Sequence, residues 1–126
     1  MWPDHCVQES DGAKFHAKCQ PDSAEVIVSK GMNERVDSYS GFGSAPEVTT
    51  LLAELQSKKV TKIYCVGLAY DYCVGSTALD GAKNGFKTYL ITDATRAVAD
   101  ATAATMKKRL QEAGVTEITS QDILIN

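Results

Sequence analysis

The amino-acid sequence predicts an α/β fold with a parallel sheet. Residues 63–69 form a continuous apolar run rich in β-branched and aromatic side chains, which is typical of a strand buried on both faces. A similar run occupies residues 87–92, and segments of helical periodicity follow both runs. Strands that alternate with helices form parallel sheets through right-handed crossovers, so we expect about four parallel strands in this chain.

The first half of the chain contains one predicted strand between two predicted helices. Residues 13–19 are compatible with a short helix, and residues 24–29 with a strand that ends at a lysine and a glycine. Residues 33–45 are rich in glycine and serine, which predicts a surface loop. Residues 46–59 place apolar side chains on one stripe behind an initial proline, so we expect an amphipathic helix there.

The second half continues the alternation after the strand at residues 63–69. Gly85 and Gly114 each follow a segment of helical spacing, where glycine is a typical residue for ending a helix. The expected elements are a helix at 73–84, a strand at 87–92, a helix at 100–113, a strand at 115–119 and a terminal turn capped by residues 120–122.

Composition excludes several classes of function. The net charge is −3 and no basic cluster occurs, so we expect no nucleic-acid partner. No apolar run is long enough to cross a bilayer, so we expect no membrane partner. The 126 residues suffice for a single domain, residues 1–126, with a core of its own. The cysteines form no CxxC pair, and free thiols favour a cytoplasmic location; they are Cys6, Cys19, Cys65 and Cys73.

Two candidate catalytic residues lie at the ends of predicted strands. Ligands bind beyond the carboxyl ends of parallel strands, which brings Lys30, residues 69–73 and Asp93 to one edge. A thiol in the first turn of a helix favours the thiolate, and a nearby ammonium adds to this effect. We therefore predict that Cys73 and Lys30 form a pair, against the alternatives of a buried structural cysteine and a solvated lysine. Asp71 is either a base near Cys73 or a turn residue that binds its own backbone.

The remaining candidates each have a structural alternative. His5 is either a hydrogen-bonded structural histidine or a metal ligand. Tyr39, in the Gly/Ser loop, is either a loop anchor or a wall against a flat ligand. Cys6, His16 and Cys19 are irregularly spaced and lack a fourth ligand, which disfavours a zinc knuckle.

Several motifs together resemble one family. The sequence is similar to the nicotinamidases of the isochorismatase-like cysteine hydrolases, and the similarity runs in the family's order over nearly the whole chain. The matching segments are residues 2–8 (WPDHCVQ), 30–31 (KG), 36–42 (VDSYSGF), 67–74 (GLAYDYCV) and 91–96 (ITDATR). The resemblance implies a three-layer α/β/α fold with a Rossmann-like parallel sheet.

The resemblance also implies an activity, the hydrolysis of nicotinamide to nicotinic acid and ammonia in NAD salvage. Cys73 matches the nucleophile that forms a thioester with the substrate, and Lys30 matches the lysine of the catalytic triad. A cis peptide bond is implied at Leu68–Ala69, with the backbone N–H groups of Ala69 and Cys73 as the oxyanion hole.

Further roles are implied around the substrate. His5 matches one ligand of a divalent metal, usually zinc, that contacts the pyridine nitrogen. Tyr39 matches an aromatic residue near the substrate ring. Tyr70 is expected beside the substrate as well, at a position where a small polar residue is common in the family.

The chain also departs from the family pattern. The catalytic aspartate and the Asp-x-His metal ligands of the family have no counterpart here, so the chain resembles a C-terminal part that lacks the N-terminal strands. The remaining sheet is expected to expose an unpaired edge and an apolar face. We therefore expect the chain to form a homo-oligomer or to be completed by another chain or by the rest of a larger polypeptide.

Three functions remain open from the sequence. The first is a nicotinamide amidohydrolase. The second is a catalytically incompetent remnant that binds a partner or oligomerises. The third is a related hydrolase that acts on another amide or on a carbamoyl group.

Overall fold

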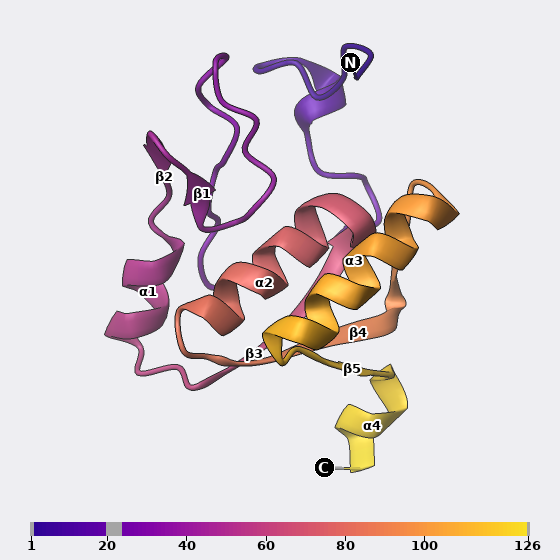
Figure 1. Cartoon of the computed structure of the whole chain (residues 1–126). Helices are drawn as coiled ribbons and strands as arrows, with labels where there is room; N and C mark the ends of the chain where they lie inside the picture. Colours follow the sequence, from indigo (N-terminus) through magenta and orange to yellow (C-terminus); the bar gives the residue numbers. More distant parts are fainter. Residues whose placement is uncertain (1, 20–23, 126) are drawn as a thin grey trace.

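A three-stranded parallel sheet organises the computed structural model, which describes residues 2–19 and 24–125 (Figure 1). The strands lie in the order β3-β4-β5, with Lys62 opposite Lys87 and Tyr89 opposite Thr116. Their bounds are β3 (Lys62–Leu68), β4 (Lys87–Arg96) and β5 (Thr116–Ile118). The predicted α/β class with a parallel sheet is confirmed, with three strands in that sheet among the described residues instead of about four.

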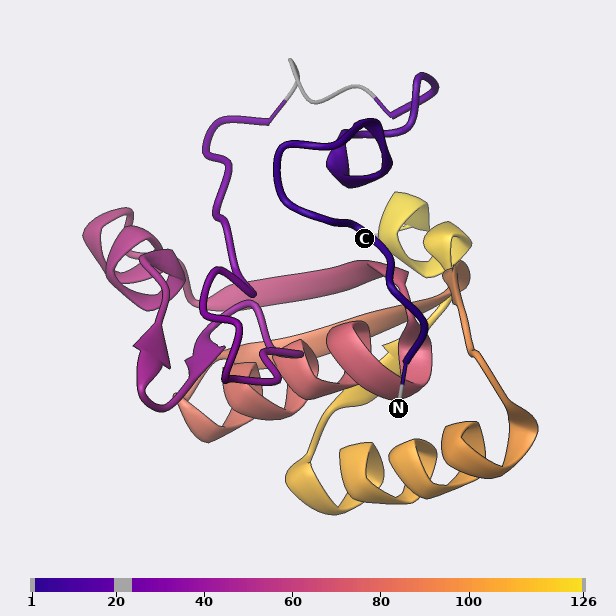
Figure 2. The same cartoon turned by 90° about the horizontal axis from the view of Figure 1, so that it is seen from above.

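Two helices, α2 (Gly75–Lys83) and α3 (Asp100–Ala113), lie side by side on one face of the sheet (Figures 1 and 2). The core lies between these helices and the sheet, and its fully buried members are Ala78, Leu90 and Leu110. A Cβ at Gly75 would lie 2.5 Å from Met106 Sδ, so α2 and α3 contact each other as closely as they do because residue 75 is glycine. The predicted helices at 73–84 and 100–113 therefore form the cover of this face.

The opposite face of β3 is open. Val66 is 57% exposed and Leu68 is 75% exposed, while α4 (Ser120–Ile125) packs near β4. The outer edge of β3 has no strand beside it in the described residues. The prediction that β3 is buried on both faces is therefore wrong for this chain. The expectation of an unpaired edge and an uncovered apolar face is confirmed for the part of the chain described.

The two elements predicted nearest the N-terminus do not form. Residues 24–29 have no regular ladder, because no described strand lies beside them to exchange hydrogen bonds. Within residues 13–19, a turn replaces the helix: His16 Nδ1 accepts the Lys18 N–H at 3.1 Å. A side chain that binds the local backbone in this way competes with helix formation. The helical turn in this region is short, η1 (Asp11–Ala13).

The helix predicted at 46–59 is shorter than expected. It forms as α1 (Leu51–Ser57), and the residues before it form the hairpin of β1 (Gly43–Ser44) and β2 (Glu47–Val48). Pro46 follows a cis bond in the turn of this hairpin instead of starting the helix. Gly43 has φ +91°, and a Cβ there would lie 2.6 Å from the Glu47 carbonyl oxygen, so the hairpin requires glycine at this position.

The later elements agree with the prediction more closely. A π-helical turn, η3 (Tyr70–Val74), continues directly into α2. The strand expected at 87–92 extends to Arg96, and the terminal turn is a short helix, α4. No helix in the described part of the chain has the length and apolar character that crossing a bilayer requires.

Candidate active site

The predicted pair of Lys30 and Cys73 comes together at the carboxyl end of β3. Lys30 Nζ donates to Cys73 Sγ at 3.4 Å and to the Ser38 carbonyl at 3.0 Å. The two side chains are 43 positions apart in sequence, so their contact depends on the tertiary fold. An ammonium this close to sulfur stabilises the negative charge of a thiolate.

Cys73 is accessible, whereas the other cysteine of this region is not. Cys65, on β3, is 9% exposed, and burial raises the pKa of its thiol to about 11. Cys73 is partly exposed and lines a groove of about 380 Å³. We call this the β3 groove; its lining residues are Phe42, Leu51, Leu55, Ile63, Tyr64, Cys65, Val66, Leu68, Cys73, Val74 and Thr77.

The turn that carries Cys73 is closed by the backbone of Ala69. The Ala69 carbonyl accepts the N–H groups of Tyr72 at 3.1 Å and Val74 at 3.0 Å. The Leu68–Ala69 peptide bond is cis, as the resemblance implies. Cys73 therefore lies within η3, one turn after the cis bond and just before α2.

Asp71 joins this turn to the start of α3. Its carboxylate is 5% exposed and accepts the N–H groups of Val98 at 2.9 Å and Ala99 at 3.1 Å, and the Thr102 hydroxyl at 2.5 Å. Burial acts to raise the pKa of Asp71, but the hydrogen bonds from Thr102, Val98 and Ala99 outweigh it and leave the pKa below its usual value. Asp71 also hydrogen-bonds its own backbone, as expected of a turn residue, and in addition its carboxylate reaches the segment that begins α3.

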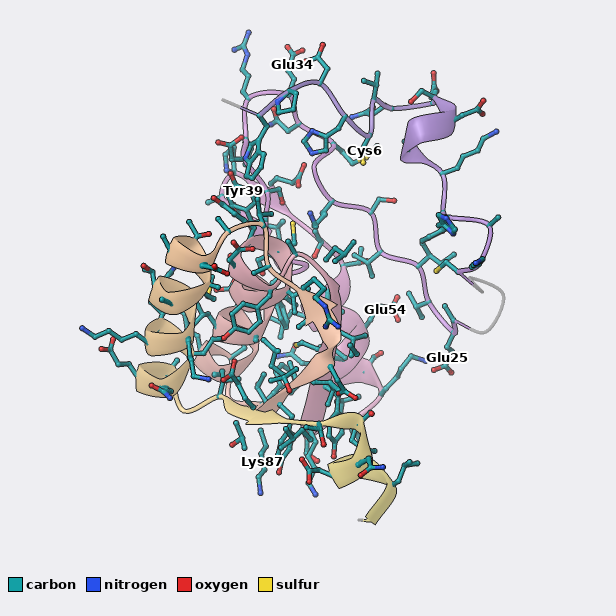
Figure 3. The ribbon with its side chains drawn as sticks, turned by 90° about the vertical axis from the view of Figure 1, so that its right-hand side faces the viewer. Cys6, Glu25, Glu34, Tyr39, Glu54 and Lys87 are labelled. Carbon is teal, nitrogen blue, oxygen red and sulfur yellow. The ribbon has the colours of Figure 1, made fainter. Side chains whose placement is uncertain are left out.

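Three aromatic rings stand beside the turn. The Trp2 indole donates to the Tyr39 hydroxyl at 3.1 Å, and its ring lies 4.9 Å from that of Tyr72. The Tyr39 and Tyr72 rings are 5.5 Å apart. Figure 3 shows Tyr39 and Cys6 at one end of the molecule and Lys87 at the other. Tyr39 was predicted from sequence as a site residue, whereas Trp2 and Tyr72 were not, although Tyr72 precedes Cys73 and the Trp2 ring lies 6.3 Å from that of His5.

His5 lies next to this cluster and can offer one ring nitrogen to a metal. Its Nδ1 is 2.7 Å from the Pro3 carbonyl, a partner that leaves Nε2 free to coordinate. In the described part of the chain, no group of three or more His, Cys, Asp or Glu side chains lies close enough together to hold a metal ion. A zinc site normally takes three or four protein ligands, so the described residues fit one ligand but not a complete site.

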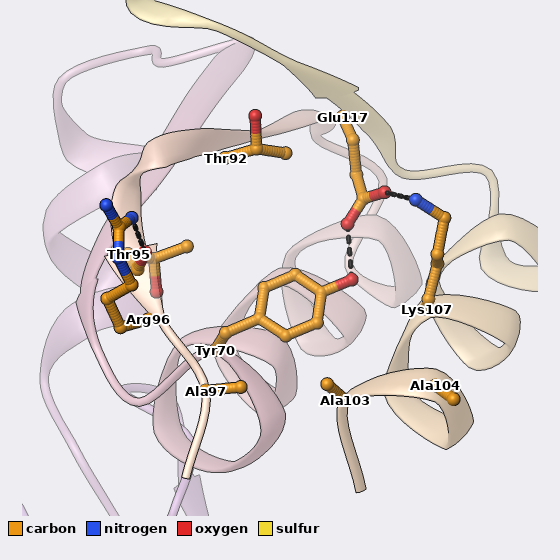
Figure 4. Close-up of a pocket in the computed structure, with 9 residues that line it drawn as sticks. All are labelled: Tyr70, Thr92, Thr95, Arg96, Ala97, Ala103, Ala104, Lys107 and Glu117. Carbon is orange, nitrogen blue, oxygen red and sulfur yellow. Dashed lines mark hydrogen bonds and ion pairs between the residues drawn. The ribbon is translucent and has the colours of Figure 1, made fainter. Parts of the chain in front are cut away.

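Tyr70 lines a different pocket from the β3 groove, and its place beside a substrate stays a prediction. Its hydroxyl donates to Glu117, whose other oxygen pairs with Lys107 Nζ at 3.3 Å (Figure 4). Burial raises the pKa of Tyr70, and the Glu117 carboxylate adds to the effect. The ring lines a separate pocket of about 350 Å³ under α3 and β5, because the π-helical turn directs residue 70 to the covered face of the sheet.

Asp93 has a structural role at the same edge. Its carboxylate accepts the Ser120 N–H at 2.8 Å and the Ser120 hydroxyl at 2.5 Å, at the start of α4. These hydrogen bonds lower the pKa of Asp93. The residue therefore connects β4 to α4 and does not contact the Lys30–Cys73 pair.

Comparison with known proteins gives a consistent assignment. The sequence model of the isochorismatase domain matches residues 1–122. The nicotinamidase of Acinetobacter baylyi is 36% identical over 134 residues, which cover 99% of this chain and 60% of that protein. The structure of PnC1 from L. infantum in complex with nicotinate is 38% identical, with a TM-score of 0.91, over 96% of this chain and 62% of its own.

A third relative is a pyrazinamidase. The Pyrococcus horikoshii enzyme, solved in complex with zinc, is 34% identical, with a TM-score of 0.82, over 94% of this chain and 63% of its own. The chain thus spans about three fifths of the length of these relatives. Because the domain model covers nearly all of the sequence and the fold agrees with it, the chain belongs to the isochorismatase family.

Proposed function

We propose that this chain carries the nucleophile of an amide hydrolase that converts nicotinamide to nicotinic acid and ammonia. The observation that supports this most strongly is the distance of 3.4 Å between Lys30 Nζ and Cys73 Sγ, at the carboxyl end of a parallel strand. The similarity to nicotinamidases supports the choice of substrate, and one similar structure contains nicotinate.

The chemistry follows from these groups. The Cys73 thiolate attacks the carboxamide carbon, the C–N bond breaks, and the amine leaves as ammonia with the proton that the thiol gave up. Water then attacks the thioester, which releases nicotinic acid and regenerates the thiol. Lys30 stabilises the thiolate, and the backbone N–H groups of Ala69 and Cys73 are proposed to bind the developing oxyanion.

The site also needs groups that the described residues do not supply. A zinc ion, when bound, would take His5 as one ligand and fix the heteroaromatic ring of the substrate. The other ligands and a general base are proposed to come from a segment outside the described residues. The β3 groove fits such a segment, because it is apolar, follows the unpaired edge of β3 and reaches Cys73.

Ammonia release from nicotinamide tests this proposal. The chain is assayed alone and after co-expression with the segment of the Acinetobacter baylyi nicotinamidase that it does not match, each with and without added zinc. We expect release from the complemented chain, loss in Cys73→Ala, and retention in Cys19→Ser, which changes an exposed thiol elsewhere. Release that persists in Cys73→Ala refutes the proposed nucleophile.

Binding or oligomerisation without catalysis is the second candidate function. The open face of β3, where Leu68 is 75% exposed, favours it. Analytical ultracentrifugation of the chain and of Leu68→Glu tests this role. A dimer that Leu68→Glu dissociates, together with no ammonia release under any condition, would favour this candidate over the hydrolase. Pyrazinamide and carbamoyl amides in the same assay test whether another amide is preferred.

A further inference from the structure

The Glu47 carboxylate binds three consecutive backbone N–H groups. Glu47 Oε1 accepts the Gly31 N–H at 2.8 Å, and Oε2 accepts those of Met32 at 2.8 Å and Asn33 at 2.9 Å. We call these three residues the 31–33 turn. Successive N–H groups that point to one side form a concave anion site, and here its anion is a side chain of the same protein.

The 31–33 turn starts immediately after Lys30. Gly31 has φ +69°, a conformation that glycine adopts without strain. The segment before Lys30 has no ladder of its own, and the 31–33 turn is held by Glu47 together with the Gln8 side chain, which donates to the Met32 carbonyl at 3.3 Å. Glu47 lies on β2, which is paired with β1, and it therefore fixes the Lys30 backbone to a regular hairpin.

The Lys30 side chain is fixed by a separate contact. Its Nζ donates to the Ser38 carbonyl at 3.0 Å, and this leaves the ammonium 3.4 Å from Cys73 Sγ. The hydrogen bond from Gly31 lowers the pKa of Glu47 most, and those from the Ser38 side chain and from the Asn33 and Met32 N–H groups add to the effect against burial. The carboxylate is therefore charged at neutral pH, and its hydrogen bonds are charge-assisted. Backbone and side chain of Lys30 are thus both restrained.

We propose that Glu47 is a positioning residue that keeps the Lys30 ammonium beside the Cys73 thiol. The inference rests on the proposed function of that pair. Glu47 acts through the 31–33 turn and not on the substrate. A side chain as long as lysine loses much conformational freedom when it is fixed, so an ordered backbone is needed to keep the amine at one place.

The charge beside Cys73 can be measured without catalysis. Iodoacetate is an anion and iodoacetamide is neutral, so the ratio of their alkylation rates at Cys73 reports the local positive charge. The rates are read by mass spectrometry of the Cys73 peptide. A unit charge near 4 Å contributes about 1 kcal/mol in a solvated setting, so we expect Lys30→Met to lower the ratio about fivefold.

Glu47→Gln is expected to lower the same ratio by about twofold or more, and Glu47→Asp to restore part of it. In the double variant with Lys30→Met, the Glu47 change is expected to have no further effect, because Glu47 acts through Lys30. Glu34→Gln is the matched control, since it removes an exposed carboxylate next to the same turn. Alkylation of the buried Cys65 reports loss of the fold.

The outcomes distinguish failure of the lysine–thiol pair from failure of the role of Glu47. A ratio unchanged by Lys30→Met refutes the lysine–thiol pair, and with it the proposed function. A ratio lowered by Lys30→Met but unchanged by Glu47→Gln refutes the role of Glu47 alone. If Glu47→Gln exposes Cys65, Gly31→Ala provides the test, because it strains the same turn without removing the carboxylate. An unchanged ratio in folded Gly31→Ala also overturns the inference.

Discussion

Replacement of Asp71 by alanine should destabilise the fold strongly, because one buried carboxylate joins the Cys73 turn to α3. The side chain is 5% exposed and accepts hydrogen bonds from Val98, Ala99 and Thr102. A hydrogen bond to a charged group contributes about 1.5–3 kcal/mol, and part of this is recovered here because Val98 and Ala99 are exposed and their N–H groups can bind water in the variant. From the three hydrogen bonds together, we expect a loss of about 2–4 kcal/mol in the free energy of unfolding.

Thermal unfolding followed by circular dichroism measures this loss. For a chain of this size, about 1 kcal/mol corresponds to a Tm change of about 3–5 °C, so Asp71→Ala should lower Tm by about 6–20 °C. The matched control is Asp37→Ala, which removes an exposed carboxylate and should leave Tm within about 2 °C. If Asp71→Ala lowers Tm by no more than Asp37→Ala does, Asp71 does not connect the turn to α3.

The pH dependence of the same variant gives an independent check. The pKa of Asp71 is lower in the folded chain than its ordinary value, so its contribution is present above the unfolded pKa and is lost as pH falls through the folded pKa. The Tm difference between wild type and Asp71→Ala should therefore be full at neutral pH and shrink below about pH 4. A difference that grows on acidification contradicts the assigned direction.

Three further predictions concern packing and reactivity. Gly75→Ala places a Cβ 2.5 Å from the Tyr70 carbonyl and should cost about 1–3 kcal/mol by urea unfolding, whereas Gly12→Ala, with its nearest atom at 3.7 Å, should be neutral. Tyr70→Phe removes the hydrogen bond to Glu117 and should cost about 1–2 kcal/mol by the same measurement; an unchanged midpoint would contradict the contact. Cys65, with its raised pKa and burial, should resist iodoacetamide at pH 8 until urea unfolds the chain, and alkylation of the native protein would show that the core is open.

The elements with strong periodicity could be predicted from sequence. The β3 and β4 strands and the helices α2 and α3 form where the apolar pattern places them, because packing between sheet and helices decides their structure. The strand predicted at 24–29 fails for the opposite reason: its sequence pattern is suitable, but a strand also needs a neighbour. The β1–β2 hairpin was missed because it consists of only two residues on each side.

The candidate site could be predicted in part. The predicted pairing of Lys30 with Cys73 is confirmed by their contact at 3.4 Å, although the strand that was expected to place Lys30 does not form in the described residues. The functions of Asp71 and Glu47 could not be read from sequence, because each carboxylate binds backbone N–H groups that are distant along the chain. The hydrogen bond from Tyr70 to Glu117 could not be predicted either, because the two residues are distant along the chain.

The central claim is that Cys73 attacks an amide carbon with the Lys30 ammonium beside it. The most direct measurement is the mass of the Cys73 peptide after the chain, complemented as described above, is mixed with nicotinamide and quenched in acid. In the first turnover, we predict a nicotinoyl thioester on Cys73 with one ammonia released for each thioester formed, and slower formation of both in Lys30→Met. Ammonia release without this thioester, or ammonia release that persists in Cys73→Ala, would contradict the proposed attack by Cys73.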